Sequence, residues 1–122
     1  MCAVIIFSSI FIGAGFYTRV LSKEVKQMED HLFDVVSYLK QEDWENCNKK
    51  TKELLKEWHS TQKWLKAIIN HKEIDLILET LYEMKGYIDV KNREEALVKA
   101  EVLKVLLEHI PENEALLFIN IL

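Results

Sequence analysis

The chain has 122 residues, of which 49% are hydrophobic, and its formal net charge is −4. This length fits one domain with at most a short appendage, and the apolar fraction is large enough to exclude wholesale disorder. All 16 basic and 20 acidic residues follow Thr18 and are interleaved, so no basic face is available and we expect no nucleic-acid partner. The sequence contains only three glycines and one proline, which favours long helices over strands joined by turns.

Residues 1–21 are predicted to form a membrane anchor that contacts lipid. No charged side chain precedes Arg19, and a helix of this length spans about 31 Å, close to the thickness of a bilayer's hydrocarbon core. Two alternatives are a cleaved signal peptide, with a small-residue site in the Gly-Ala-Gly run at 13–15, and an apolar helix inside a soluble protein. Basic residues follow the span at Arg19, Lys23 and Lys26, and this pattern favours a cytoplasmic domain.

Residues 22–122 are predicted to form an all-α domain, an antiparallel bundle of about four helices that continues directly from the transmembrane helix. Four stripes of mainly apolar residues recur with helical spacing. They are Leu21, Val25, Met28, Leu32, Val35 and Leu39; Trp44, Cys47, Thr51, Leu54, Trp58, Thr61 and Leu65; Ile74, Ile77, Leu81, Met84 and Ile88; and Ala96, Ala100, Leu103, Leu107 and Ile110. Cys47 lies on the second stripe, so we interpret it as a core residue and expect no intrachain disulfide.

Local signals predict where these helices begin and end. Asp43 is a plausible N-cap, and Asn-x-x-Glu patterns at 70–73 and 92–95 resemble capping boxes. Gly86 is suited to a left-handed C-cap, and Pro111 is expected to stop the last helix. The second and fourth stripes align at an offset of 49 residues, but any two capped helices with heptads align about this well, so the pattern does not establish a repeat.

The best candidate functional cluster is His71, Glu73 and Asp75, with His109 as a further member. His71 and Asp75 are four residues apart, so both could face one metal from a single helical face. The structural alternative is a helix start, where Glu73 and Asp75 complement the positive end of the helix dipole. Two ligands do not make a site, and we favour this structural interpretation. We therefore assign no catalytic, metal or cofactor-binding residues, and we expect no cofactor.

Several segments together carry a resemblance to a known family. They are Asp43-Trp44, the tryptophans Trp58 and Trp64, the segment Asn70 to Asp75, the segment Leu107 to Pro111, and the ending Asn120-Ile121-Leu122. In this combination the chain resembles a bacterial, clostridial-type family, domain-of-unknown-function family 4363, over nearly its whole length. The resemblance implies a single N-terminal membrane segment, a helical domain and no assigned activity. Many members carry basic residues before the apolar segment, which this chain lacks; the resemblance favours the extracellular side.

These observations predict a single-pass protein of the bacterial cell membrane with its helical domain outside. We expect an accessory or scaffold subunit that acts through contacts with a protein partner and is not an enzyme. One alternative is a helical binding module secreted after signal cleavage. The other is a metal-dependent enzyme that uses the cluster at His71, Glu73 and Asp75.

Overall fold

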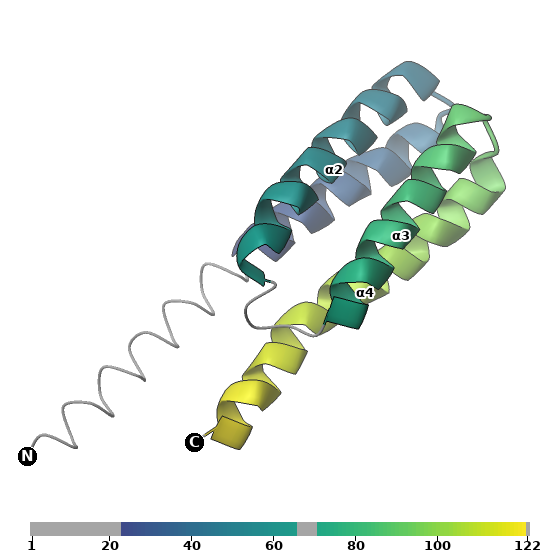
Figure 1. The fold of residues 1–122 in the computed structure, drawn as a ribbon. Coiled ribbons are helices and arrows are strands. Elements are labelled where there is room, and N and C mark those ends of the chain that lie inside the picture. Colours follow the sequence, from purple (N-terminus) through teal and green to yellow (C-terminus); the bar gives the residue numbers. More distant parts are fainter. Residues whose placement is uncertain (1–22, 66–70, 122) are drawn as a thin grey trace, which may run out of the picture.

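The computed structural model describes residues 23–65 and 71–121, with side chains described up to residue 110. The described residues form four helices and no strand: a helix at 23–40, α2 (Trp44–Leu65), α3 (His71–Asp89) and α4 (Arg93–Ile121). The helices lie side by side and alternate in direction (Figure 1). The prediction of an all-α antiparallel bundle is confirmed. The predicted anchor at 1–21 and the predicted capping residue Asn70 lie outside the described residues.

The predicted stripes form the core of the bundle. From Val25 to Ile110, every predicted stripe residue is buried except Trp44, which is partly buried and packs against the core. This agreement follows from helix geometry, because residues spaced alternately three and four apart share one face and must pack against neighbouring helices. Three threonines inside the helices are buried. The hydroxyls of Thr51 and Thr80 donate to the carbonyls of Cys47 and Leu76, one turn back, and that of Thr61 donates to the Glu24 carboxylate on the first helix at 3.1 Å.

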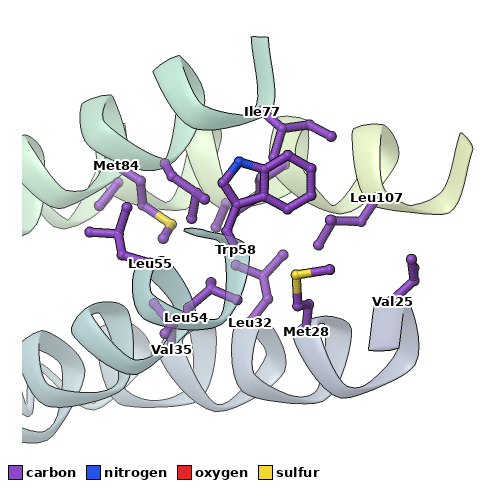
Figure 2. Close-up of a cluster of buried hydrophobic side chains, with 14 of the residues drawn as sticks. Val25, Met28, Leu32, Val35, Leu54, Leu55, Trp58, Ile77, Met84 and Leu107 are labelled. Atoms are coloured by element: carbon purple, nitrogen blue, oxygen red, sulfur yellow. The ribbon is translucent and has the colours of Figure 1, made fainter. Parts of the chain in front are cut away.

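Trp58 occupies the middle of this core. Its side chain is fully buried, and Figure 2 shows its indole among Met28 and Leu32 from the first helix, Ile77 from α3 and Leu107 from α4. One side chain of α2 therefore contributes to the packing of all four helices. Its Nε1 has no hydrogen-bond partner among the described residues. An unpaired buried N–H costs about 1–3 kcal/mol, so the apolar surface of the indole carries the stabilisation at this position.

Two turns at one end of the bundle have the same backbone structure. Each places a non-glycine residue in the left-handed region, Glu42 (φ 55°) in the first turn and Lys91 (φ 58°) in the second. In each turn the next residue donates its N–H to a carbonyl five residues back, Asp43 to Tyr38 and Asn92 to Tyr87. This is a Schellman C-cap. The residue that completes it then caps the following helix.

The cap residues Asp43 and Asn92 were predicted from the sequence, and both are confirmed. The side chain of Asp43 accepts from the backbone N–H of Asn46 at 3.3 Å, and that of Asn92 accepts from the N–H of Glu95 at 3.3 Å. Two other expectations are wrong. Gly86 lies inside α3 and has no positive φ, because the left-handed position falls at Lys91. Pro111 does not end α4, which continues to Ile121; a proline removes one backbone hydrogen bond, and the rest of the helix tolerates this loss.

The two turns belong to a more extensive internal correspondence. An offset of 49 residues aligns not only α2 with α4 but also the first helix with α3. Every buried residue of the second hairpin except Thr80 then falls on a buried residue of the first. Ion pairs follow the same relation, since Lys50 contacts Asp34 in the first hairpin and Lys99 contacts Glu83 in the second. The alignment that the sequence left open therefore has matching turns, buried positions and ion pairs in the structure, and we interpret the bundle as two similar helical hairpins.

The topology also decides which ends of the chain lie together. The two turns occupy one end of the bundle, and the start of the first helix, the start of α3 and the later part of α4 occupy the other (Figure 1). At this second end α4 extends beyond the first residue of α3. Among residues 23–65 and 71–121, no helix is both long and apolar enough to cross a membrane.

The central position of Trp58 predicts a large difference between two substitutions. Trp58→Ala should lower the free energy of unfolding by about 3–5 kcal/mol, because it leaves a large cavity in the core. Trp58→Phe should cost clearly less than Trp58→Ala, because an aromatic ring remains, the cavity is smaller and the unpaired N–H is removed. Urea denaturation of the full chain in mild detergent, followed by circular dichroism, measures both. Trp44→Ala is the control, and a loss at Trp44 as large as that at Trp58 would contradict this account of the core.

Candidate functional site

The members of the cluster predicted from the sequence belong to two helices, three of them to the start of α3 and His109 to α4. His71 and Asp75 are exposed on one side of α3, whereas Glu73 is half-buried in its first turn, and His109 is exposed on α4. Asp75 lines a shallow hollow of about 550 Å³ on α3 with Leu78, Glu79, Tyr82 and Glu83. In the part of the chain that the structure describes, no three His, Cys, Asp or Glu side chains are placed to hold one metal ion. The candidate cluster therefore stays a prediction.

A polar network not predicted from the sequence joins the first helix to α2. His31 lies between two carboxylates, with Nε2 3.4 Å from Oε2 of Glu57 and Nδ1 3.9 Å from Oε2 of Glu53. Lys50 extends the network, because its Nζ lies 3.3 Å from Glu53 and 3.7 Å from Asp34. The contacts of His31 lack hydrogen-bond geometry. Carboxylates thus alternate with the imidazole of His31 and the ammonium of Lys50 across the seam, and we interpret the network as a polar contact between two helices.

A second polar bridge joins α2 to α3. The Nε2 of His59 lies 3.3 Å from the hydroxyl of Tyr82, and its Nδ1 lies 3.1 Å from Nε2 of Gln62. Because an amide nitrogen can only donate, Nδ1 of His59 is the acceptor and Nε2 carries the proton, which it donates to the tyrosine oxygen. This assignment follows from the placement of the Gln62 amide. The bridge positions the exposed ring of Tyr82 against α2.

Cys47 is a core residue, as the sequence predicted. It is fully buried, and burial raises the pKa of its thiol to about 11. The raised value favours the neutral thiol in the folded chain. Its contribution to stability is therefore complete below the lower pKa of the unfolded thiol and is lost as the pH rises towards 11. At neutral pH Cys47 is an inert packing residue, because the reactive form of cysteine is the thiolate.

The outward face of α4 carries an apolar stripe that the sequence analysis missed. Val98, Val102 and Val105, here called the valine ridge, lie four and three residues apart, and 55%, 42% and 44% of their respective surfaces are exposed. Glu101, Val102, Val105 and Leu106 line a shallow hollow of about 250 Å³ on this face. Three apolar residues aligned on an exposed helical face form a patch, whereas single exposed apolar residues are ordinary. The signal was present in the spacing, but the buried stripe of the same helix drew the prediction to the opposite face.

A deeper groove lies beside the valine ridge, between the first helix and α4. Its volume is about 420 Å³, and Glu101 lines both this groove and the hollow on the ridge. The remaining lining residues are Glu29, Asp30, Leu32, Phe33, Val36, Lys40, Ala100 and Lys104. Phe33 is 74% exposed. Ridge and groove thus form one continuous surface that combines apolar side chains with carboxylates.

Glu29 shows that negative charge accumulates at this seam. Partial burial, and then the neighbouring carboxylates of Glu108 and Asp30, raise the pKa of the Glu29 carboxyl, against the smaller opposing effects of Lys104 and Lys26. Desolvation and like charges both disfavour the carboxylate form. The seam between the first helix and α4 is therefore a place where an additional cation would be favourable.

The fold places the chain in the class of small all-α bundles, here made of two similar helical hairpins. The model of one family, Domain of unknown function (DUF4363), matches residues 16–121. The chain belongs to this family, as the resemblance in the sequence predicted. Searches of the curated proteins and of the solved structures found no match.

The raised pKa of Glu29 predicts a pH-dependent effect of Glu29→Gln. A carboxyl group with a raised pKa in the folded state contributes stability at acid pH and loses it as the pH rises through that pKa. Glu29→Gln should therefore raise the melting temperature of the full chain at pH 7, and the gain should shrink as the pH falls to about 4, where the wild-type carboxyl is protonated in both states. Thermal melts in mild detergent across this range measure the difference. A variant less stable than wild type at pH 7 would contradict the account of crowded carboxylates.

Proposed function

We propose that this protein is a membrane-tethered helical module, an accessory or scaffold subunit that acts through protein contacts rather than catalysis. Residues 1–21 would form a single-pass anchor in the bacterial cell membrane. The domain after it would lie on the extracellular side. The exposed valine ridge and its adjoining groove would supply the contact surface.

One observation carries the tether: the first described helix begins at the end of the bundle where α4 finishes. The first helix follows the uncharged stretch of residues 1–18, and α4 reaches Ile121 through the apolar sequence A-L-L-F-I-N-I at 115–121. Antiparallel packing brings the start of the first helix and the later part of α4 to one end (Figure 1). The opposite end consists of the two capped turns, with the charged residues Glu42, Lys91 and Arg93. Apolar segments at one end and charged turns at the other suit a domain that stands on a membrane.

The apolar, exposed side chains of α4 support protein contact as the mode of action. Surfaces of this kind on small domains commonly mark sites of association, because their burial releases about 25 cal/mol per Å² of apolar surface. Among the described residues, no three His, Cys, Asp or Glu side chains are placed to hold a metal ion, which favours contact over metal-dependent chemistry in this proposal. The surface features that the described residues do bring together are those of an interface.

Labelling of a single cysteine tests the tether and its orientation. The variant combines Cys2→Ser with Val90→Cys, because Val90 is 71% exposed in the turn far from the apolar ends. The protein should be found in the membrane fraction, and a membrane-impermeant maleimide should label position 90 in intact cells. The control is Cys2→Ser alone, which retains only the buried Cys47 and should stay unlabelled at pH 7 until the protein is unfolded.

A separate outcome of this experiment would contradict the orientation, the anchor and the buried core. Labelling at position 90 only after the cells are broken would place the domain in the cytoplasm. Recovery of the full-length protein in the soluble fraction would refute the anchor. Labelling of Cys47 in the folded control would show that the described core is not the core in the cell.

A further inference from the structure

Because the two hairpins are similar, the outward face of α2 shows which residues suffice on a solvent-exposed face of this bundle. The outward face of α4 can be compared with it. With the offset of 49 residues, the three valines of the ridge correspond to Lys49, Glu53 and Lys56 on α2. All three are exposed, and Glu53 pairs with Lys50 and contacts His31. Two helices with the same core spacing thus differ at the same outward positions, charged on α2 and apolar on α4. Packing of the bundle does not require valine there, so these side chains have another cause.

The residues beside the ridge differ between the two helices in the same systematic way. Glu94, Glu101 and Glu108 recur every seven residues along the side of the ridge that faces the first helix. All three are exposed. Arg93 lies 3.9 Å from Glu94, whereas Glu101 has no ion-pair partner in the described part of the chain. Their counterparts on α2 are Glu45, Lys52 and His59, which are mixed in charge. The apolar ridge therefore has an acidic border that its repeat lacks.

The lysines of α4 do not neutralise this border. Lys99 is directed to α3, where it pairs with Glu83. Lys104 is directed to the first helix and lines the groove beside Glu29 and Asp30. Carboxylates still outnumber ammonium groups at this seam. Glu108 and Asp30 add to the effect of burial in raising the pKa of Glu29. A cationic group placed beside Glu101 and Glu108 would be attracted by their carboxylates.

We propose that the valine ridge is the docking site of an amphipathic helix of another protein, whose apolar stripe is flanked by lysine or arginine. The inference rests on the proposed function and names the chemistry of its partner. Apolar residues of the incoming helix would cover Val98, Val102 and Val105 at spacings of three and four residues, as in helix-in-groove recognition. Its basic residues would face Glu101 and Glu108, and Phe33 would close the groove beside it. Hydrophobic burial then supplies affinity, while the charges select the partner and its direction.

Two other molecules could cover the ridge, a second copy of the chain or an anionic lipid surface, and charge argues against both. A second copy of the chain would set two identical acidic borders beside each other. In an antiparallel pairing Glu101 would face Glu101, and Glu94 would face Glu108, and like charges at these positions destabilise helix pairs. An anionic lipid surface would be repelled by the same glutamates. The ridge also begins near the turn end of the bundle, the end opposite to the proposed tether.

Photocrosslinking of the full chain in the cells that produce it tests this assignment. A benzophenone amino acid replaces Val102, and matched variants carry it at Leu76, which is 46% exposed on α3, or at Val90 in the turn. We expect the probe at 102 to give a protein adduct that those at 76 and 90 do not give. Mass spectrometry should map the adduct to a segment with apolar residues at helical spacing and Lys or Arg beside them.

Charge reversal supplies the second readout. Glu101→Lys combined with Glu108→Lys should lower the yield of the adduct at position 102 by about tenfold or more, because it opposes like charges across the contact. The control reverses the same amount of charge elsewhere, Glu45→Lys with Glu79→Lys, both exposed, and should leave the yield unchanged. Circular dichroism checks that both variants retain the fold.

The remaining outcomes would overturn the inference. They also distinguish a failure of this docking site from a failure of the proposed function. An adduct of the chain with itself, an adduct with lipid, or a crosslinked segment that lacks basic residues would assign the ridge to another occupant. A protein adduct at 76 or 90 but not at 102 would refute the ridge while leaving an interaction module intact. No protein adduct from any of the three positions would count against both. Equal loss of the adduct in the two charge-reversal variants would remove the role of the acidic border.

Discussion

The burial of Trp58 is the contact on which the rest of the bundle depends. Its indole reaches side chains from all four helices, so it fixes the two hairpins against each other as well as the turns within each. Its counterpart in the second hairpin is Leu107, a much smaller side chain. The core is therefore repeated in spacing but not in volume. Such a difference lets two similar hairpins pack in one defined arrangement, because the large side chain fits only where small ones surround it.

The core needs apolar residues only at the inward positions of each helix, so the residues at the outward positions can differ between helices. On α2 those positions hold lysine and glutamate, which keep a helix solvated and supply ion pairs such as Lys50 with Glu53. On α4 the same positions hold valine, which has a weaker helix propensity and exposes apolar surface. Local stability would favour the arrangement on α2. A feature that departs from local preference while the core is preserved is the kind that function introduces.

The fold was largely predictable, because burial in helices follows a period that the sequence displays directly. Val25, Ile77 and Leu103 could be assigned to the core without any knowledge of their partners. The capping residues Asp43 and Asn92 were predictable for a similar reason, since their side chains act on a backbone three residues away. Gly86 and Pro111 misled the prediction, because their conformational preferences are tendencies that the surrounding helix outweighed at both positions.

The candidate surface was harder to predict, because it depends on neighbours that are distant in the sequence. His31 and Glu57 belong to different helices, and nothing in their local sequence indicates that they meet. The valine ridge is local, yet its meaning comes from comparison with α2, and that comparison needed the identical turns at Glu42 and Lys91 to establish the repeat. The spacing of His71 and Asp75 shows the same limit, because two residues on one helix cannot indicate whether a third ligand comes from elsewhere in the chain.

The repeat of two hairpins has a consequence for how such a chain can evolve. One hairpin alone exposes its core stripe, and it could bury that stripe only against a second hairpin, most simply another copy of itself in a two-fold dimer. This bundle has the arrangement of such a dimer joined into a single chain. In a symmetric dimer, every substitution on one outer face occurs on the other as well. Joining the halves removes that obligation, so one half can remain a solvated support while the other acquires a surface for a different molecule.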